Sequence, residues 1–387
     1  MRVSAVTVAM VCTIGVAVSA CGSSSGGQSS GGHRATASTQ VGAGIVNVWK
    51  GPAADLTRLP LGTARVSLTT AAVGGLYSCD AGNPNGGGAQ VAGPWLDEAA
   101  GTWDATKKPA VQGSVDWPSA HNEEQENGDT RSFSSNGLPF DATTGVFPIA
   151  STDPAYAYDR NPNRIGETTI ALALPRTPTP AARPACLGKG LVGYLRNGVV
   201  LFASIDEGNR DAVAYEVQDH CDGHPQQSGT YHYHDIPRCV LRSAKGPSTV
   251  VGFALDGYPI VVERDQAGTL PTDADLDECH GRTSPIVLEG AVVTTYHYSA
   301  TSEFPYFIGC YHGVVPTNAV SSFKAASSGL AGPPPGQGPA GGGSPSGQDP
   351  PPGQGPPPGQ DPPPGQGPPP GQGPPPGQGP PATGPTS

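Results

Sequence analysis

The chain is 387 residues long, includes 56 glycines and 45 prolines, and carries a formal net charge of −11. This negative charge argues against nucleic acid or an anionic membrane surface as an electrostatic partner. The Gly and Pro content argues against long helices, because both residues destabilise helix interiors. We therefore expect short strands and long loops.

The N-terminus has the pattern of an export signal. Arg2 precedes an apolar, small-residue run from 3 to 18, and Val18-Ser19-Ala20-Cys21 follows. Small residues before a cysteine resemble the lipobox of bacterial lipoproteins, which implies cleavage before Cys21 and a lipid on its thiol. The run is too short and too rich in small residues for a membrane-spanning helix. We predict a lipoprotein signal peptide at 1–20 and a lipid anchor in the cell membrane, on its extracytoplasmic face; an ordinary secreted protein is the alternative.

Residues 21–44 have the composition of a flexible tether, mostly Gly, Ser, Ala and Thr with almost no large apolar side chain. Residues 45–129 form a β-rich N-terminal part that the sequence does not assign to a domain of its own. Within it, residues 46–49 and 64–68 alternate between apolar and polar at period two, which predicts two short strands.

Strand signals become stronger from residue 130 onward. Asn197-Gly198 lies between the apolar runs 191–195 and 199–203, and this pattern predicts a hairpin with a two-residue turn. Asp256-Gly257, also flanked by apolar residues, predicts a second hairpin. The predicted fold class is therefore mainly β, with antiparallel sheets and long loops, held by disulfides and flanked by disordered terminal segments.

The chemistry of the chain is concentrated between Cys221 and Cys239. Three histidines lie in this stretch, one in Cys221-Asp222-Gly223-His224 and two in Tyr231-His232-Tyr233-His234. Successive side chains of a strand point to opposite faces, so His232 and His234 would share one face and the two tyrosines the other. The sequence thus presents two imidazoles side by side.

A second copy of the Thr-Tyr-His-Tyr motif occurs further along the chain. Thr230-Tyr231-His232-Tyr233 returns as Thr295-Tyr296-His297-Tyr298, but Ser299 then stands where the first copy has His234. The repeat therefore supplies at most one more histidine.

Six cysteines remain once Cys12 leaves with the signal and Cys21 carries lipid. An even set in an exported chain predicts three disulfides, because the compartment is oxidising. Thiolate metal ligands are disfavoured because no CxxC pair occurs. Six cysteines allow many pairings, but each copy of the Tyr-His phrase has one cysteine before it and one after it. The repeat therefore favours the pairs Cys221–Cys239 and Cys279–Cys310, with Cys79–Cys186 left as the third.

Several motifs occur in a fixed order between residues 130 and 315. They are Ser135-Asn136-Gly137-Leu138-Pro139, Cys221-Asp222-Gly223-His224, Gly229-Thr230-Tyr231-His232-Tyr233-His234, the segment 252–260, the segment 276–281 and the segment 304–310. Together they resemble the YHYH domain family, and the ordered set is far more specific than the four-letter motif. The resemblance implies an exported protein whose function is largely uncharacterised. We place this domain at 130–325.

The clustered histidines predict a metal site. Neutral imidazole is the commonest protein metal ligand, and two rings on one strand face offer two nitrogens to one ion. His224 would join His232 and His234 from the same loop, and His297 would join them if the two copies pair as neighbouring strands. With the thiols oxidised, imidazole ligands suit zinc or copper. The carboxylates that we expect to orient the rings are Asp222, Asp235 and Asp256.

Two classes of function stay open. The first is a metal-binding domain, extending to a metalloenzyme of unknown substrate if the ion keeps an open position. The second is a structural or adhesive surface module whose Tyr-His repeat only packs, with neither metal nor catalysis. No Ser-His-Asp elbow, phosphate-binding loop, dinucleotide fingerprint or HExxH motif occurs, so the familiar enzyme classes receive no support.

The C-terminal segment repeats Pro-Pro-Pro-Gly-Gln followed by Gly or Asp, from residue 333 to about 381. It has no core-forming side chains, and triple prolines favour extended polyproline II. Collagen is excluded, because Gly does not fall at every third position. We predict a disordered tail at 326–387 that contacts the cell wall or another extracellular polymer.

Overall fold

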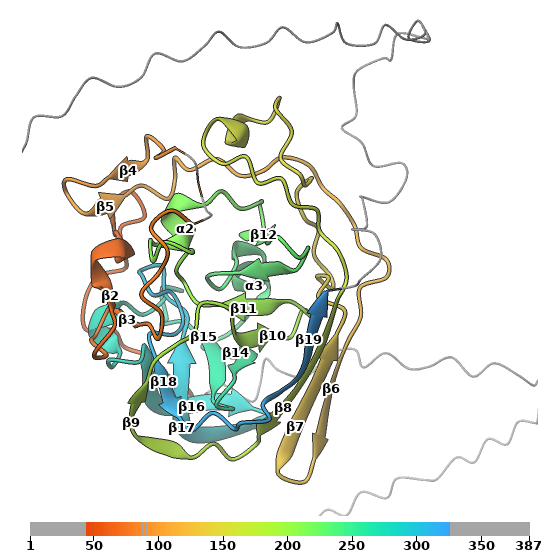
Figure 1. Cartoon of the computed structure of the whole chain (residues 1–387). Coiled ribbons are helices and arrows are strands. Elements are labelled where there is room, and N and C mark those ends of the chain that lie inside the picture. The colour runs from red at the N-terminus through yellow and green to blue at the C-terminus, as the bar shows by residue number, and fades with distance from the viewer. Residues whose placement is uncertain (1–43, 87–88, 90, 326–387) are drawn as a thin grey trace, which may run out of the picture. The chain divides into compact units, whose positions relative to one another are not determined.

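The computed structural model describes residues 44–86, 89 and 91–325 (Figure 1). The predicted signal peptide, the lipidated Cys21, almost all of the tether and the Pro-rich tail lie outside these residues. Among the residues described, none of the helices is both long and apolar enough to cross a membrane.

The largest sheet has eight strands in two matching halves. In each half a hairpin pairs in parallel with a Tyr-His-Tyr strand, which pairs antiparallel with one outer strand. The halves meet at the antiparallel pair β10–β14, where Tyr194 lies opposite Phe253. In spatial order the strands are β12 (Gly223–Pro225), β13 (Tyr231–Tyr233), β11 (Val200–Phe202), β10 (Leu191–Leu195), β14 (Ser248–Ala254), β15 (Pro259–Glu263), β17 (Ala291–Ser299) and β16 (Gly281–Leu288).

A four-stranded sheet packs against the middle of the large one. Its strands in spatial order are β19 (Val320–Ala325), β8 (Thr168–Pro175), β7 (Thr130–Ser135) and β6 (Asn122–Asn127). Alternate residues of β7 are buried, and the Phe133 ring stacks on Tyr194 with centroids 3.8 Å apart. The guanidinium of Arg131, on the same face, lies 4.0 Å from the centroid of Phe253. The hydrophobic core therefore forms where the two sheets meet.

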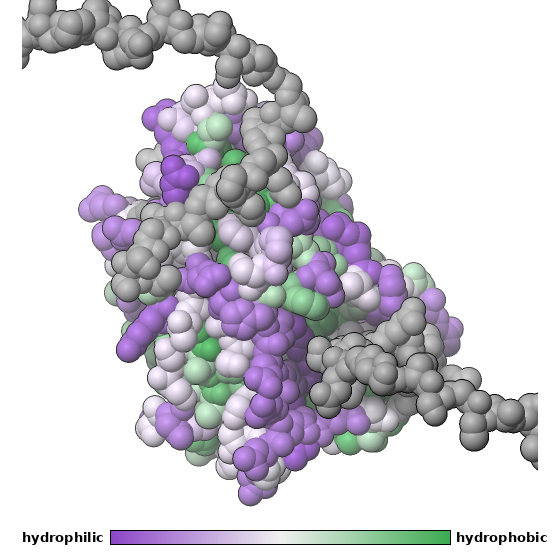
Figure 2. Space-filling model, turned by 90° about the vertical axis from the view of Figure 1, so that its right-hand side faces the viewer, coloured by the Kyte–Doolittle hydropathy of each residue, from purple (hydrophilic) through white to green (hydrophobic). Residues whose placement is uncertain are grey.

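The edge strand β6 is rich in Glu, which suits an edge exposed to solvent because charged side chains discourage pairing with other chains. Figure 2 faces the side on which β6 lies in Figure 1 and shows a mainly hydrophilic surface with smaller hydrophobic areas.

The other elements are short. They are the three-stranded sheet β1 (Leu59–Pro60), β5 (Thr102–Trp103) and β4 (Leu96–Asp97), the pairs β18 (Tyr311–Gly313) with β9 (Pro180–Ala185) and β2 (Val66–Ser67) with β3 (Leu76–Tyr77), the helices α2 (Ala212–Tyr215) and α3 (Arg238–Ser243), and the 3-10 turns η1 (Gly62–Arg65), η2 (Pro154–Ala157) and η3 (Asp273–Asp275). The predicted strand at 46–49 does not form, and within 64–68 only two residues are strand. Alternation over four or five residues is too short to specify a strand without a long partner beside it.

The predicted fold class is confirmed, and both predicted hairpins form. Gly198 and Gly257 have φ of 95° and 88°, a backbone conformation that favours glycine in tight turns. The disulfides join Cys79–Cys186, Cys221–Cys239 and Cys279–Cys310, which is the pairing that the repeat favoured.

Candidate metal centre

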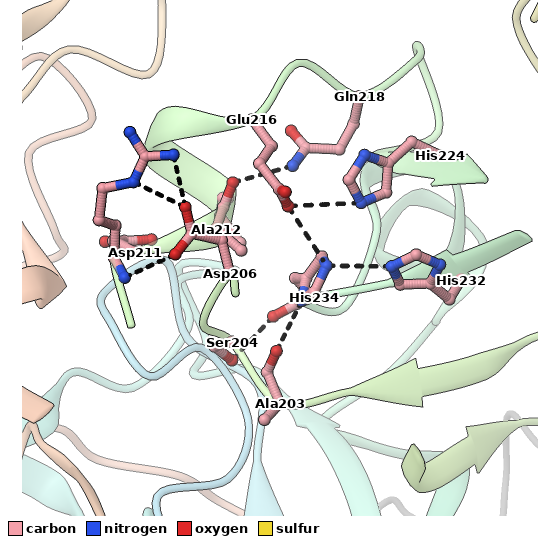
Figure 3. Close-up of polar contacts among 12 residues, drawn as sticks. Ala203, Ser204, Asp206, Asp211, Ala212, Glu216, Gln218, His224, His232 and His234 are labelled. Carbon is pink, nitrogen blue, oxygen red and sulfur yellow. Dashed lines mark hydrogen bonds and ion pairs between the residues drawn. The ribbon is translucent and has the colours of Figure 1, made fainter. Parts of the chain in front are cut away.

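Strands β12 and β13 bring three histidines together. His224 lies directly opposite His232 in the antiparallel pair, and His234 follows two residues later. All three side chains are buried, and each offers a ring nitrogen so placed that the three nitrogens lie within 4.8 Å of one another. The short strands thus place the rings at one point, as Figure 3 shows.

Backbone carbonyls fix which nitrogen of two of these rings carries the proton. His232 Nδ1 lies 3.1 Å from the carbonyl of Thr230, and His234 Nδ1 lies 2.6 Å from that of Ala203. A carbonyl only accepts, so both Nδ1 atoms must donate and both Nε2 atoms present a lone pair in the neutral rings. These two Nε2 atoms face each other at 3.1 Å. Two facing lone pairs repel, so the pair requires a shared cation or proton.

The site also contains a carboxylate that the sequence did not predict. Glu216 follows α2, and its Oε2 lies 3.5 Å from Nε2 of His224 and 3.5 Å from Nε2 of His234 (Figure 3). Within the described part of the chain, neither this oxygen nor either ring nitrogen of His224 has a hydrogen-bond partner. The only sequence signal for Glu216 is a single charge inside the apolar run 212–217, and buried charges are rare unless they are paired.

Three of the six distances among these four donor atoms are close to the edges of a tetrahedral site. Ligands about 2.0–2.1 Å from a tetrahedral ion lie roughly 3.3 Å apart. The Nε2 atoms of His232 and His234 are 3.1 Å apart, and Glu216 Oε2 is 3.5 Å from two ring nitrogens. The three histidine nitrogens lie within 4.8 Å of one another, so the rings would have to move closer together to share one ion.

Comparison with known protein families agrees with the sequence motifs. The family model described as YHYH protein matches residues 171–269, which include the three histidines and Glu216. Residues 171–269 are a YHYH domain. No curated protein and no solved structure matches the chain. The second Tyr-His-Tyr copy lies beyond the matched segment of the YHYH domain.

Burial keeps the rings of the YHYH domain neutral. It lowers the pKa of His234 to about 4, and it lowers the pKa values of His224 and His232 well below the ordinary value, with the neighbouring rings adding to the effect. Burial also raises the pKa of Glu216 well above its ordinary value, and the charges of Asp206 and Asp159 add to this shift. A cation at the centre would offset the cost of an ionised Glu216.

A cavity of about 630 Å³ opens onto the cluster. Its lining includes the three histidines and Glu216, other polar residues such as Asp159, Asn161, Lys189 and Gln226, and the apolar Phe202 and Ile205. Its size is in the range of small-molecule sites. The donors of the YHYH domain are therefore buried side chains that border a cavity large enough for a small molecule.

The structure separates His297 from the other predicted ligands. Strands β11, β10, β14 and β15 lie between β13 and β17, so the two copies are not neighbouring strands. His297 Nε2 lies 3.0 Å from Glu263 Oε2 instead.

In the described part of the chain, the carboxylates expected to orient the rings make their hydrogen bonds elsewhere. Asp222 pairs with Arg238, and Asp256 accepts from the Tyr298 hydroxyl. Among the residues described, neither these two nor Asp235 hydrogen-bonds a ring of the cluster. The backbone carbonyls of Thr230 and Ala203 orient the rings of His232 and His234 instead.

The tyrosines of the YHYH motif have a packing role on the opposite strand face. Tyr231 donates to Asp219 at 2.9 Å, and the Tyr233 hydroxyl accepts from Asn197 at 3.0 Å. Both rings are fully buried. The alternation of the motif thus divides it into a structural face and a face that holds the candidate site.

Proposed function

We propose that this YHYH domain binds one zinc or copper ion through His224, His232 and His234, with the Glu216 carboxylate as the fourth donor. The observation that supports this most is the pair of Nε2 lone pairs that face each other at 3.1 Å in a buried site. A shared proton is the other way to relieve the repulsion, but the lowered pKa values of both rings oppose it. A metal ion needs neutral rings, and burial favours the neutral form.

The donor set supports zinc or copper as the ion. Three imidazoles with one carboxylate are a ligand set that suits both ions, and the six cysteines among the described residues are in disulfides. The adjoining cavity supports an ion that a small molecule can reach. A metalloenzyme or a ligand-binding metal site also needs an open coordination position. We therefore extend the proposal to that class with Glu216 as the donor that a small molecule would displace, and we leave the substrate open.

The test is elemental analysis by mass spectrometry of the mature chain, produced with its disulfides intact and without a polyhistidine tag. We expect about one equivalent of zinc or copper in the wild type and none in His232→Ala/His234→Ala. His121→Ala, which removes a more exposed histidine outside the cluster, should keep the ion. A wild type that is metal-free and resists reloading would contradict the proposal. It would leave the alternative of a structural or adhesive surface module, supported by the packing of the motif tyrosines.

We also propose that the protein is exported and anchored in the cell membrane by lipid on Cys21. The three disulfides support export, because they persist in oxidising compartments. In a bacterial host the wild type should incorporate labelled palmitate and fractionate with membranes. Cys21→Ala should lose the label and appear in the soluble exported fraction. An unlabelled wild type in the medium would show ordinary secretion instead.

A further inference from the structure

The two halves of the large sheet are related by position as well as by strand order. His224 pairs with His232 across β12 and β13, and Arg282 pairs with His297 across β16 and β17. Gly223 opposite Tyr233 corresponds in the same way to Gly281 opposite Tyr298. Arg282 therefore occupies the position of His224, and Ser299 occupies that of His234.

The hydrogen bonds around the second copy repeat those of the first. His297 Nδ1 lies 3.1 Å from the Thr295 carbonyl, as His232 Nδ1 does from that of Thr230. Tyr296 donates to Asp277 at 3.1 Å, which corresponds to the contact of Tyr231 with Asp219. The second half thus orients the Nε2 of His297 toward the position that corresponds to the centre of the histidine cluster in the first half.

A buried carboxylate also lies at that point, supplied by a different element. Glu263 ends β15 and is fully buried, with Oε2 3.0 Å from His297 Nε2 and 2.7 Å from the Ser299 hydroxyl. Its Oε1 is 3.1 Å from the Arg282 guanidinium. The carboxylate is therefore paired with the Arg282 guanidinium through one oxygen. Because His297 Nδ1 faces a carbonyl, the approach of its Nε2 to the other oxygen also requires a proton between them.

We propose that the second half is a dormant metal site, in which the Arg282 guanidinium supplies the positive charge that a metal ion supplies in the first half. Replacing Arg282 and Ser299 by histidine would give three histidines and one glutamate, the donor set of the first site. This inference assumes the proposed function, namely that the first half binds a metal ion. The described contacts of His297, Glu263 and Arg282 do not depend on that assumption.

The test is the metal content of Arg282→His/Ser299→His after incubation with zinc and removal of free ion. We expect the content to rise from about one equivalent to about two, as two four-donor sites require. Placed in the His232→Ala/His234→Ala background, the same two substitutions should raise it from none to about one. Arg282→His/Ser299→Ala, with only one new imidazole, should gain no tightly held ion.

The outcomes separate the two proposals. A folded double variant that still holds one equivalent would overturn the dormant site and leave the first site intact. A metal-free wild type would count against the first site, while a gain of one equivalent in the double variant would still support the second.

A further pair of variants keeps the inference testable if the double variant fails to fold. Arg282→Lys retains a cation beside Glu263, and Arg282→Met has similar length without charge. We expect the Met variant to have a lower melting temperature than the Lys variant, because Glu263 would stay buried with its Arg282 partner removed. Equal melting temperatures would show that the charge of Arg282 is not what the site needs.

Discussion

Saturating the metal-free protein with its ion is expected to raise the free energy of unfolding by about 4 kcal/mol, when free ion exceeds the dissociation constant about 1,000-fold. The reason is that Glu216 and the three histidines converge only in the folded chain, so the ion binds the folded state and not the unfolded one. For a domain of this size the melting temperature should rise by on the order of 10 °C. Thermal and denaturant unfolding of chelated and reloaded samples would measure the effect.

The control for this stabilisation is His232→Ala/His234→Ala, which should unfold at the same temperature with and without ion. His121→Ala should be stabilised as much as the wild type. An equal rise in the double variant would mean that the ion binds elsewhere in the chain, and would count against the proposed site.

The stabilisation by metal should also depend on pH. Burial raises the pKa of Glu216, so below that pKa the ion must displace a proton from the carboxyl group. The stabilisation by the ion is therefore largest above the raised pKa of Glu216, and it is lost as the pH falls through that pKa. His234, with a pKa of about 4, competes with the ion only at lower pH. Glu216→Gln should bind the ion more weakly. Its binding should no longer weaken as the pH falls through the raised pKa of Glu216, because the carboxyl group is gone.

The parts of the site that follow from local geometry could be predicted from the sequence. The shared face of His232 and His234 follows from the period of a strand, which needs no knowledge of its neighbours. The disulfide pairing followed from the repeat, because each copy of the phrase carries its own pair of cysteines. Both hairpins followed from turn residues that tolerate positive φ.

The parts that depend on the order of the sheet could not be predicted. The separation of His297 from the cluster is set by the four strands between β13 and β17, and no local pattern encodes that order. Glu216 reaches the site from the end of a four-residue helix, placed by long-range packing. The carbonyl of Ala203 contacts His234 only because the chain after β11 runs beside the end of β13. Sequence motifs thus supplied three of the donors, and the topology supplied the fourth and the partners that orient them.

Removing the Cys221–Cys239 disulfide is expected to affect both the fold and the site. This bond closes a loop with a sequence separation of 18 that contains His224, His232 and His234. In the chain-entropy model, opening a loop of this size lowers the free energy of unfolding by about 3 kcal/mol. Because the same loop carries the three ligands, Cys221→Ala/Cys239→Ala should also weaken metal binding by about tenfold or more, as loss of supporting contacts around metal ligands does.

The Cys279–Cys310 disulfide provides the matched comparison. Its loop has a sequence separation of 31 and carries His297, which lies outside the cluster. Cys279→Ala/Cys310→Ala should lose a similar amount of stability, about 3–4 kcal/mol in the same model, and keep the metal affinity of the wild type. Denaturant unfolding and zinc titration of both variants would measure the two effects separately. Equal affinity in the two variants would mean that the pairing of β12 with β13 holds the histidines in place without the covalent bond.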